Sequence, residues 1–236
     1  MSSIKNPGRF AGLLYILLSI PGFFATIYVP GKLIVHGNAA VTAGNIAASE
    51  TFFRLGIAGQ LICQAGWIFV ALALYHLFQG VSRWQASLYV ILTVASIPIG
   101  FLNELNSIAA LALVRGADFL SIVEKPQREV LAMLFLNLHS DGIVIVELFG
   151  PCLVMLAVLA YRSRFLPCFL GVWLAIDGFA YLILSLTGVL LPQYYNQMLT
   201  YAQPASFGEV AFMFWLVIKG AKPPALEVTG RSSAAA

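Results

Sequence analysis

Long apolar segments, separated by short polar or charged stretches, dominate the hydrophobic pattern of this chain. A helix rises about 1.5 Å per residue, so about 20 apolar residues cross a hydrocarbon core of about 30 Å. Six segments are predicted to span a membrane, the last of them the shortest, at residues 10–29, 55–78, 86–113, 126–161, 165–191 and 205–218. The pattern therefore predicts an all-α, polytopic helical membrane protein with six transmembrane helices.

The segment between the first and second spans predicts a short interfacial helix. Thr42 can cap this helix at its start, and we expect it to run to Arg54. Its apolar side chains Ile46, Ala47 and Phe53 are spaced to lie on one face, as in helices that rest on a membrane surface. The expected fold is thus six transmembrane helices plus short interfacial helices.

The fourth apolar run is too long for a single crossing. It extends over 36 residues, 126–161, which is about 54 Å of helix and nearly twice the thickness of a hydrocarbon core. Either one helix projects well beyond the membrane, or the run breaks into an interfacial piece and a span. We expect a break at 139–142, because Gly142 weakens a helix and Ser140 or Asp141 can cap the next one.

The composition agrees with a membrane location and excludes other classes. Hydrophobic residues make up 60% of the 236 residues and charged residues 10%, with a mean hydropathy of +0.89, whereas a soluble domain carries about 25% charged residues. The net charge of +3 is too small to indicate nucleic-acid binding. Cys63, Cys152 and Cys168 lie in or beside apolar segments without the spacing of a zinc or redox site, so we expect reduced, space-filling thiols.

Six spans place both termini on one side of the membrane. If that side is the cytoplasm, it carries eight basic residues: Lys5, Arg9, Arg83, Arg162, Arg164, Lys219, Lys222 and Arg231. The other side carries five, Lys32, Arg54, Arg115, Lys125 and Arg128, partly offset by Glu50, Asp118, Glu124 and Glu129. Because basic residues accumulate in cytoplasmic loops, both termini are expected in the cytoplasm. Residues 1–220 are expected to form one transmembrane domain, and 221–236 a disordered cytoplasmic tail.

The candidate functional residues are the polar ones embedded in the apolar segments. Ionisable groups are costly there, so they usually pair with one another or line a polar cavity. The candidates for ligand binding or proton handling are Arg54, Asn103, Glu104, His139, Asp141, Glu147, Asp177, Tyr181 and Glu209. The sequence contains no nucleotide-binding loop, nucleophile elbow or HExxH motif, so the common enzyme classes have no support in it.

Helical geometry separates some of these candidates and groups others. Each residue turns about 100°, so Asp141 lies about 200° around a helix from His139, and Glu147 about 80°. We interpret Asp141 as a helix cap at the outer interface. His139 either bonds to a neighbouring carbonyl or has a functional role. In the third span, Glu104 and Ser107 share a face that is expected to point into the bundle or towards a cavity.

A specific ion pair is predicted between the second and sixth spans. Arg54 opens the second span from the outside, and Glu209 lies about a turn and a half inside the sixth, so their depths nearly agree. A guanidinium can hold a carboxylate through two hydrogen bonds, which would satisfy both groups where water is scarce. We therefore expect an Arg54–Glu209 pair, with His139 or Glu104 as further partners.

Several short motifs are distributed along nearly the whole chain. They are Gly12-Leu-Leu-Tyr15, Phe53-Arg54-Leu-Gly56, Leu138-His139 with Gly142, Tyr161-Arg-Ser-Arg-Phe-Leu-Pro167, Gly171, Gly178-Phe-Ala-Tyr181 and Phe207-Gly208-Glu209. Together they resemble a bacterial multi-pass membrane family known as domain-of-unknown-function family 4386, in which Arg54, His139 and Gly208-Glu209 match recurrent positions. The resemblance implies the fold and a location in the bacterial cytoplasmic (inner) membrane. The family has no established activity, so the resemblance implies no substrate and no cofactor.

Three kinds of function fit this pattern. In the first, the carboxylates line an outward-opening cavity of a small carrier or sensor for a proton, a cation or a small amphiphile. Six spans are few for a monomeric carrier, so a homodimer in the lipid bilayer is expected. In the second, His139, Asp141 and Glu209 hold a metal ion in an intramembrane enzyme, although zinc usually has more nitrogen or sulfur ligands. In the third, the polar residues only join helices of a structural or assembly protein.

Overall fold

The computed structural model describes residues 6–222, and within that range the chain forms helices and loops without a strand. The α-helices are α1 (Pro7–Phe23), α2 (Val29–Leu33), α3 (Ala39–Ala48), α4 (Glu50–Phe78), α5 (Arg83–Arg115), α6 (Lys125–Val146), α7 (Pro151–Arg162), α8 (Cys168–Leu190) and α9 (Tyr195–Ile218). A π-helix, η1 (Phe24–Tyr28), joins α1 to α2, and three 3-10 turns, η2 (Asp118–Leu120), η3 (Glu147–Phe149) and η4 (Pro192–Tyr194), precede α6, α7 and α9. The predicted tail, 221–236, lies outside the described residues except for its first two.

Within residues 6–222, five helical segments are long and apolar enough to cross a membrane. They are Pro7–Leu33, Glu50–Phe78, Arg83–Arg115, Lys125–Arg162 and Cys168–Leu190. The predicted all-α architecture is confirmed for the described residues, and these segments fit the prediction of a membrane protein. The predicted sixth span belongs to α9, which has 24 residues but begins with a polar half and is not among the five.

The short helix between the first two spans differs from the prediction. The side chain of Asn38, not that of Thr42, caps α3 by accepting a hydrogen bond from the Val41 amide. Thr42 lies inside the helix, where its hydroxyl bonds to the backbone of Val35. The chain leaves helical geometry at Ser49, with φ −128° and ψ 41°, so the residues that follow belong to α4 and not to an interfacial helix.

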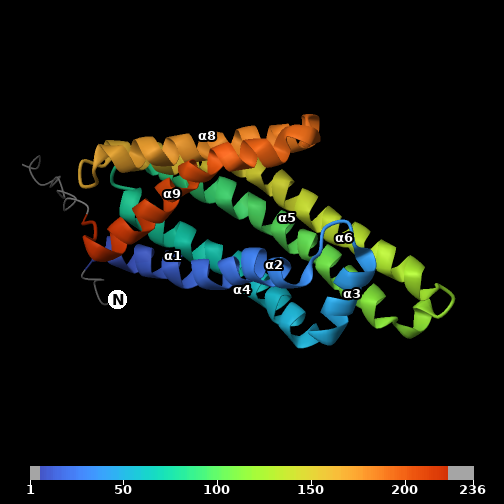
Figure 1. The fold of residues 1–236 in the computed structure, drawn as a ribbon. Helices are drawn as coiled ribbons and strands as arrows, with labels where there is room; N and C mark the ends of the chain where they lie inside the picture. The colour runs from blue at the N-terminus through green and yellow to red at the C-terminus, as the bar shows by residue number, and fades with distance from the viewer. Residues whose placement is uncertain (1–5, 223–236) are drawn as a thin grey trace, which may run out of the picture.

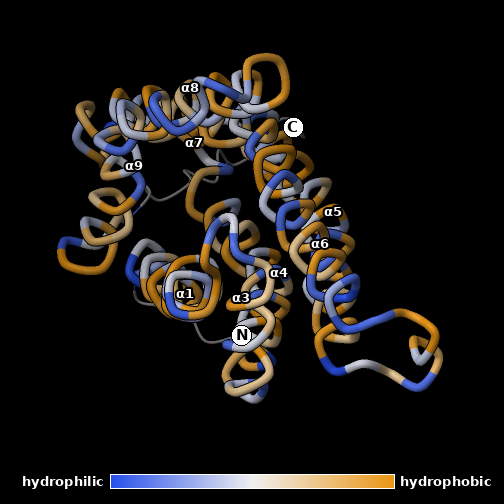
Figure 2. The backbone as a smooth tube through the Cα atoms, turned by 45° about the vertical axis from the view of Figure 1, so that its right-hand side comes forward, coloured by the Kyte–Doolittle hydropathy of each residue, from blue (hydrophilic) through white to orange (hydrophobic). Residues whose placement is uncertain are grey.

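The long helices contact one another in a closed circuit. α4 packs against α1 and α5, α5 packs also against α6 and α7, and α7 packs against α8. α9 completes the circuit, because it packs along α8 and then crosses to α1 (Figure 1). In Figure 2, α7, α8 and α9 lie on one side and α1, α3 and α4 on the other, with α5 and α6 alongside both groups.

Two hydrophobic cores stabilise this arrangement. The larger core lies near the end at which α1 begins and includes Ala11, Tyr15, Leu74, Phe78, Tyr89, Leu156 and Phe212. The smaller core includes Val29, Ile46, Phe53, Ala110 and Leu136, where α3 covers α5 and α6. On α5 the larger core stops at Tyr89 and the smaller one starts at Ala110, so Glu104 lies between the two cores.

The long fourth segment breaks, but not at the predicted position, 139–142. Residues 139–142 lie inside the continuous helix α6, and the irregular stretch is η3 with Gly150. Pro151 has no amide hydrogen to offer the Glu147 carbonyl one turn earlier. That carbonyl instead accepts a hydrogen bond of 2.9 Å from the Gly150 amide, which closes a 3-10 turn. The predicted break at 139–142 is therefore wrong, because the missing proline donor decides the position.

The helices differ in length, and this difference creates a projecting end. α5 has 33 residues and α8 has 23, which correspond to about 50 Å and 35 Å. Gly188, near the end of α8, packs against Val144 of α6. The first part of α6 and the last part of α5 therefore continue beyond α8, as Figure 1 shows.

Candidate functional site

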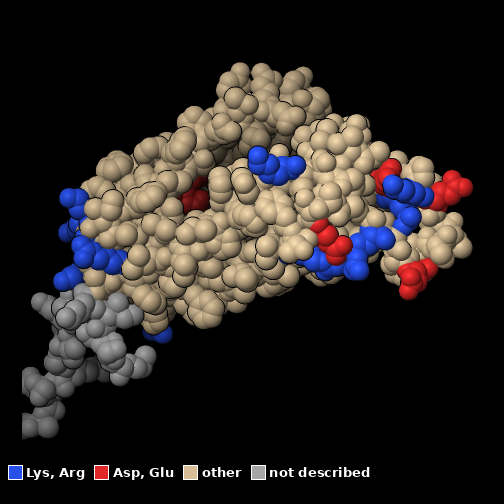
Figure 3. Space-filling view, turned by 60° about the horizontal axis from the view of Figure 1, so that its bottom comes forward, with Lys and Arg blue, Asp and Glu red and all other residues tan. Residues whose placement is uncertain are grey.

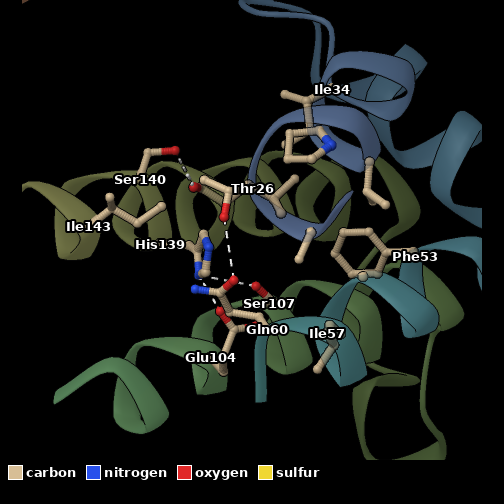
Figure 4. A pocket seen from close by; sticks show the side chains of 15 residues that line it. Thr26, Ile34, Phe53, Ile57, Gln60, Glu104, Ser107, His139, Ser140 and Ile143 are labelled. Carbon is tan, nitrogen blue, oxygen red and sulfur yellow. Dashed lines mark hydrogen bonds and ion pairs between the residues drawn. The ribbon is translucent and has the colours of Figure 1, made fainter. Parts of the chain in front are cut away.

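A polar cavity lies between η1, α4, α5 and α6, at the start of the projecting end. Its volume is about 100 Å³, enough for several water molecules. Its polar lining consists of Thr26, Gln60, Glu104, Ser107, His139 and Ser140, and the rest of the lining is mainly apolar. Figure 4 shows His139 reaching from α6 towards Glu104 and Ser107 on α5, with Gln60 and Thr26 beside them. Four separate elements thus contribute polar groups to one small space.

His139 is held through one of its two ring nitrogens. Its Nδ1 lies 3.3 Å from the Asn103 carbonyl oxygen, 3.2 Å from the Ser107 hydroxyl and 3.6 Å from a Glu104 carboxylate oxygen. A carbonyl oxygen can only accept, so Nδ1 carries the hydrogen in this arrangement. In a neutral imidazole Nε2 then has the free lone pair. Nε2 makes no hydrogen bond with the described residues, and it is not among the fully buried unpaired atoms.

Asn103 fixes the backbone on both sides of this contact. Its side-chain amide donates a hydrogen bond of 2.9 Å to the His139 carbonyl, while its own carbonyl accepts from the His139 ring. Gly142 makes room for the amide group, because a Cβ at that position would overlap the Asn103 side chain. The two helices can therefore approach closely enough for His139 to reach α5.

Glu104 is the acidic group of the cavity and is almost fully buried, with 3% of its surface exposed. A buried carboxylate is costly unless a partner compensates its charge or hydrogen-bonding groups. His139 is the titratable partner that it has, and the cavity lining contains no lysine or arginine. The polar lining therefore contains one acidic side chain and no permanently basic one.

The π-helix η1 shapes one side of the cavity. Pro30 lacks the amide that would bond to the Thr26 carbonyl in an α-helix, and the Val29 amide bonds instead to the Phe24 carbonyl five residues back. The Thr26 hydroxyl donates a hydrogen bond of 3.3 Å to the Gln60 side chain on α4. Single π-turns occur frequently at functional sites. The wall of the cavity thus contains a widened helical turn.

The predicted pair between Arg54 and Glu209 does not form. Arg54 bonds to Glu50, one turn earlier on the same helix, at 2.7 Å, and Arg115 approaches the same carboxylate at 3.5 Å. The main neighbours of α4 are α1, α5 and η1, whereas α9 packs on α8 and α1. Glu209 is half-buried beside Gly208, which packs against Trp173 of α8. The prediction was wrong because agreement in depth does not make two helices neighbours.

Asp141 also differs from its interpretation as a helix cap. It lies in the interior of α6 and is exposed, on the face opposite His139. The proposed metal ligands His139, Asp141 and Glu209 therefore point in different directions or come from separate elements. Among residues 6–222, no group of three or more His, Cys, Asp or Glu side chains is placed to hold a metal ion.

The remaining candidates form a second group at the break before α7. Gly150 packs against the backbone of Gly178 and the Cβ of Tyr181, and Asp177 is one turn before Tyr181 on α8. One carboxylate oxygen of Asp177 and one of Glu147 are buried without a hydrogen-bond partner in the described part of the chain. Asp177 is 2% exposed. These acids are separate from the His139 cavity, whose lining includes neither of them.

The predicted candidates include Asn103, Glu104 and His139 but not the lining residues Gln60, Thr26 and Ser140. A signal for Gln60 was present, since an amide side chain in the middle of an apolar span usually faces a polar partner. Thr26 and Ser140 gave no such signal, because a hydroxyl can bond to its own helix; the Ser140 hydroxyl does so with the Leu136 carbonyl. Their position follows from how the helices pack.

Comparisons with known proteins identify the family of the chain. No curated protein and no solved structure matches the chain significantly. One family model does match, over residues 10–220, and its description is "Domain of unknown function (DUF4386)". The match includes all four elements of the His139 cavity and covers most of the 236 residues. The chain therefore belongs to this family of uncharacterised proteins.

Proposed function

We propose that this protein is a small membrane carrier or sensor that binds a proton or a small cation at the His139–Glu104 pair. The observation that carries the proposal is the 3.6 Å approach of these two groups inside a cavity to which four elements contribute. Glu104 and His139 are the two ionisable side chains of the lining. A site used merely to join helices would need neither a cavity nor a free ring nitrogen.

The chemistry of the lining defines the ligand class. The lone pair of His139 Nε2, the Glu104 carboxylate and the Gln60 carbonyl oxygen are all acceptors. A ligand that donates hydrogen bonds and carries positive charge complements this set, and an ammonium group does both. The cavity volume of about 100 Å³ limits the bound part to a few non-hydrogen atoms. A larger amphiphile would place only its polar head there.

The proposed topology puts this cavity at the outer edge of the membrane. In it, α9 serves as the sixth span, both termini are cytoplasmic, and α8 matches the thickness of a bacterial inner membrane. The site then lies just beyond the outer end of α8, open towards the outside. On the face shown in Figure 3, basic side chains without acidic ones gather at the end where α1 begins, and both kinds gather at the other end. This distribution supports the orientation.

The acids at the helix break favour a carrier over a sensor. Broken helices near the middle of a membrane form the ion sites of many transporters, and Asp177 lies near the middle of α8. Its unpaired oxygen, and that of Glu147, offer a second position for a proton or cation. Figure 3 also shows acidic atoms at the bottom of a hollow between the two ends. We expect such a carrier to work as a homodimer.

Two titrations of the purified protein in detergent test the proposal. Methylammonium should raise the thermal unfolding midpoint, and tetramethylammonium, which has no N–H donor, should not. Glu104→Gln and His139→Gln should each abolish the difference. Asp141→Asn, which removes a carboxylate from the exposed face of α6, should retain this difference between the two ammonium ions.

In acid–base titration between about pH 8 and pH 5, Glu104→Gln and His139→Gln should each bind fewer protons than Asp141→Asn. Equal proton counts and no ammonium response would refute the proposal and favour a structural role.

A further inference from the structure

Arg128 differs from every other basic residue that the structure describes. Between residues 6 and 222, each of the other lysines and arginines is exposed, whereas Arg128 is partly buried. Its Nε is completely buried and has no hydrogen-bond partner in that part of the chain. The other arginines of the projecting end, Arg54 and Arg115, share the carboxylate of Glu50. A partly buried guanidinium without an acidic partner is unusual, because its charge is not compensated and its Nε donor is unsatisfied.

The guanidinium lies at a cavity that is distinct from the His139 site. This cavity has a volume of about 110 Å³ and lies between α3, the end of α5 and the start of α6. Lys125, Arg128 and Glu129 supply its charged groups, and Ala40, Ala43, Gly44 and Ala47 of α3 supply a wall of small residues. Lys125 and Glu129 approach each other to 3.9 Å, so they compensate each other. The charge of Arg128 remains, and the lining is positive by one unit.

Gly116 holds the guanidinium in place without bonding to it. This residue ends α5 in the left-handed region, with φ +67°, which favours glycine. A Cβ at this position would overlap the Arg128 guanidinium, so the bare Cα is the surface against which the group packs. Arg128 is thus positioned at the cavity, and its donors are not used by the described residues.

A purely structural role for Arg128 would require an interaction with the C-terminal end of α5. The last carbonyl groups of a helix attract a cation, and Arg128 lies beside this end. The amides of Gly116 and Ala117 already satisfy the Ala112 and Leu113 carbonyls, and no hydrogen bond joins Arg128 to the remaining ones in the described chain. The helix dipole by itself does not explain an empty space next to the guanidinium.

We propose that this cavity binds an oxyanion, a carboxylate or a phosphate group, through the guanidinium of Arg128. The planar guanidinium fork matches the two oxygens of either group, and the small side chains of α3 leave room for it. The anion can come from a free metabolite or from the headgroup of an acidic lipid, since both present the same oxygens. This inference does not depend on the function proposed for the His139 site.

The test measures phosphate and acetate binding to the purified full-length protein in uncharged detergent at constant ionic strength. Both anions should raise the thermal unfolding midpoint of the natural protein, with chloride as the reference. Arg128→Gln should weaken binding by about tenfold or more, because charged hydrogen bonds are lost. Arg128→Lys keeps the charge but loses the fork, so it should bind with intermediate strength. Arg83→Gln, an exposed arginine at the opposite end, should bind like the natural protein.

A second variant fills the cavity without changing any charge. A Cβ on Gly44 would meet no atom within 4 Å, so Gly44→Leu extends into the open space and should abolish anion binding while the protein stays folded. Gly31→Leu is its matched control, since Gly31 also faces open space but does not line this cavity. Unchanged phosphate and acetate responses in both Arg128→Gln and Gly44→Leu would overturn the proposal.

The two sources of the anion are distinguished in lipid nanodiscs. If the headgroup of phosphatidylglycerol occupies the site, nanodiscs that contain this lipid should stabilise the natural protein more than phosphatidylcholine nanodiscs, and phosphate should add nothing. If a free anion occupies it, phosphate should stabilise the protein equally in both. Arg128→Gln should remove whichever difference is found, and a difference that persists in this variant would contradict the assignment.

Discussion

At the scale of residues, contacts between polar side chains of different helices form the candidate site. Glu104 and His139 were predicted as candidates because ionisable groups in apolar spans need partners, and the structure brings these two together. Arg54 was assigned to a distant partner, although Glu50 lies four residues earlier, the spacing at which helical side chains meet. The contacts of Thr26 and Gln60 join separate helices, and no spacing within the sequence reveals such a pair.

Gly142 provides a test at this scale. The change Gly142→Ala should lower the stability by about 1–3 kcal/mol, because the added methyl group collides with the Asn103 amide and the core must adjust. In an Asn103→Ala background the same change should cost clearly less, since the obstacle has been removed. Thermal unfolding in detergent of the four proteins of this double-mutant cycle measures the coupling. Additive losses would show that the two residues do not interact.

At the scale of elements, the long helices were predictable and their irregularities were not. The length of the fourth apolar run, 36 residues, predicted a segment longer than a membrane is thick, and α6 with α7 forms this segment. The break was placed at Gly142 because glycine weakens a helix, but glycine still donates its amide. Pro151 does not, and the helix therefore changes at η3. The π-helix at Phe24–Tyr28 follows a similar rule, since Pro30 leaves the Thr26 carbonyl without its usual donor.

Replacing Pro151 tests this explanation of the break. In Pro151→Ala the new amide can bond to the Glu147 carbonyl and continue the α-helix, so amides around residues 147–151 should exchange hydrogen more slowly. Mass spectrometry of peptides that cover this region measures the change. Pro98→Ala is the matched control, because Pro98 lies inside the unbroken helix α5 and its replacement should leave the region unchanged. Unaltered exchange in Pro151→Ala would mean that packing, and not the missing donor, breaks the helix.

At the scale of the whole molecule, composition and hydropathy predicted the class, and the matched family model confirmed the resemblance over residues 10–220. Which helices contact one another could not be predicted from the sequence, because similar apolar stripes can pack against many different neighbours. Unequal helix lengths produce the projecting end, where a second core forms around α3. Both cavities described above lie at this end or at its start. The proposed orientation turns it to the outside of the cell.

Cysteine labelling tests this orientation. In a variant without the three natural cysteines, a cysteine at Ser121, in the loop between α5 and α6, should react with a membrane-impermeant maleimide in intact cells. Cysteines at Ser2 and Ser233 should react only after the membrane has been opened, because the excess of basic residues on that side favours a cytoplasmic location for both ends. The reverse labelling pattern would place the His139 cavity on the cytoplasmic side.

The most direct test of the central claim observes the His139 ring itself. The chain has three histidines, so nitrogen-15 NMR of histidine-labelled protein, with His139→Gln to assign the signal, gives the protonation state of each ring nitrogen. Our account predicts that neutral His139 carries its hydrogen on Nδ1, and that methylammonium shifts the unprotonated Nε2 signal in the natural protein but not in Glu104→Gln. A hydrogen on Nε2, or an Nε2 signal that does not respond to the ligand, would contradict the account.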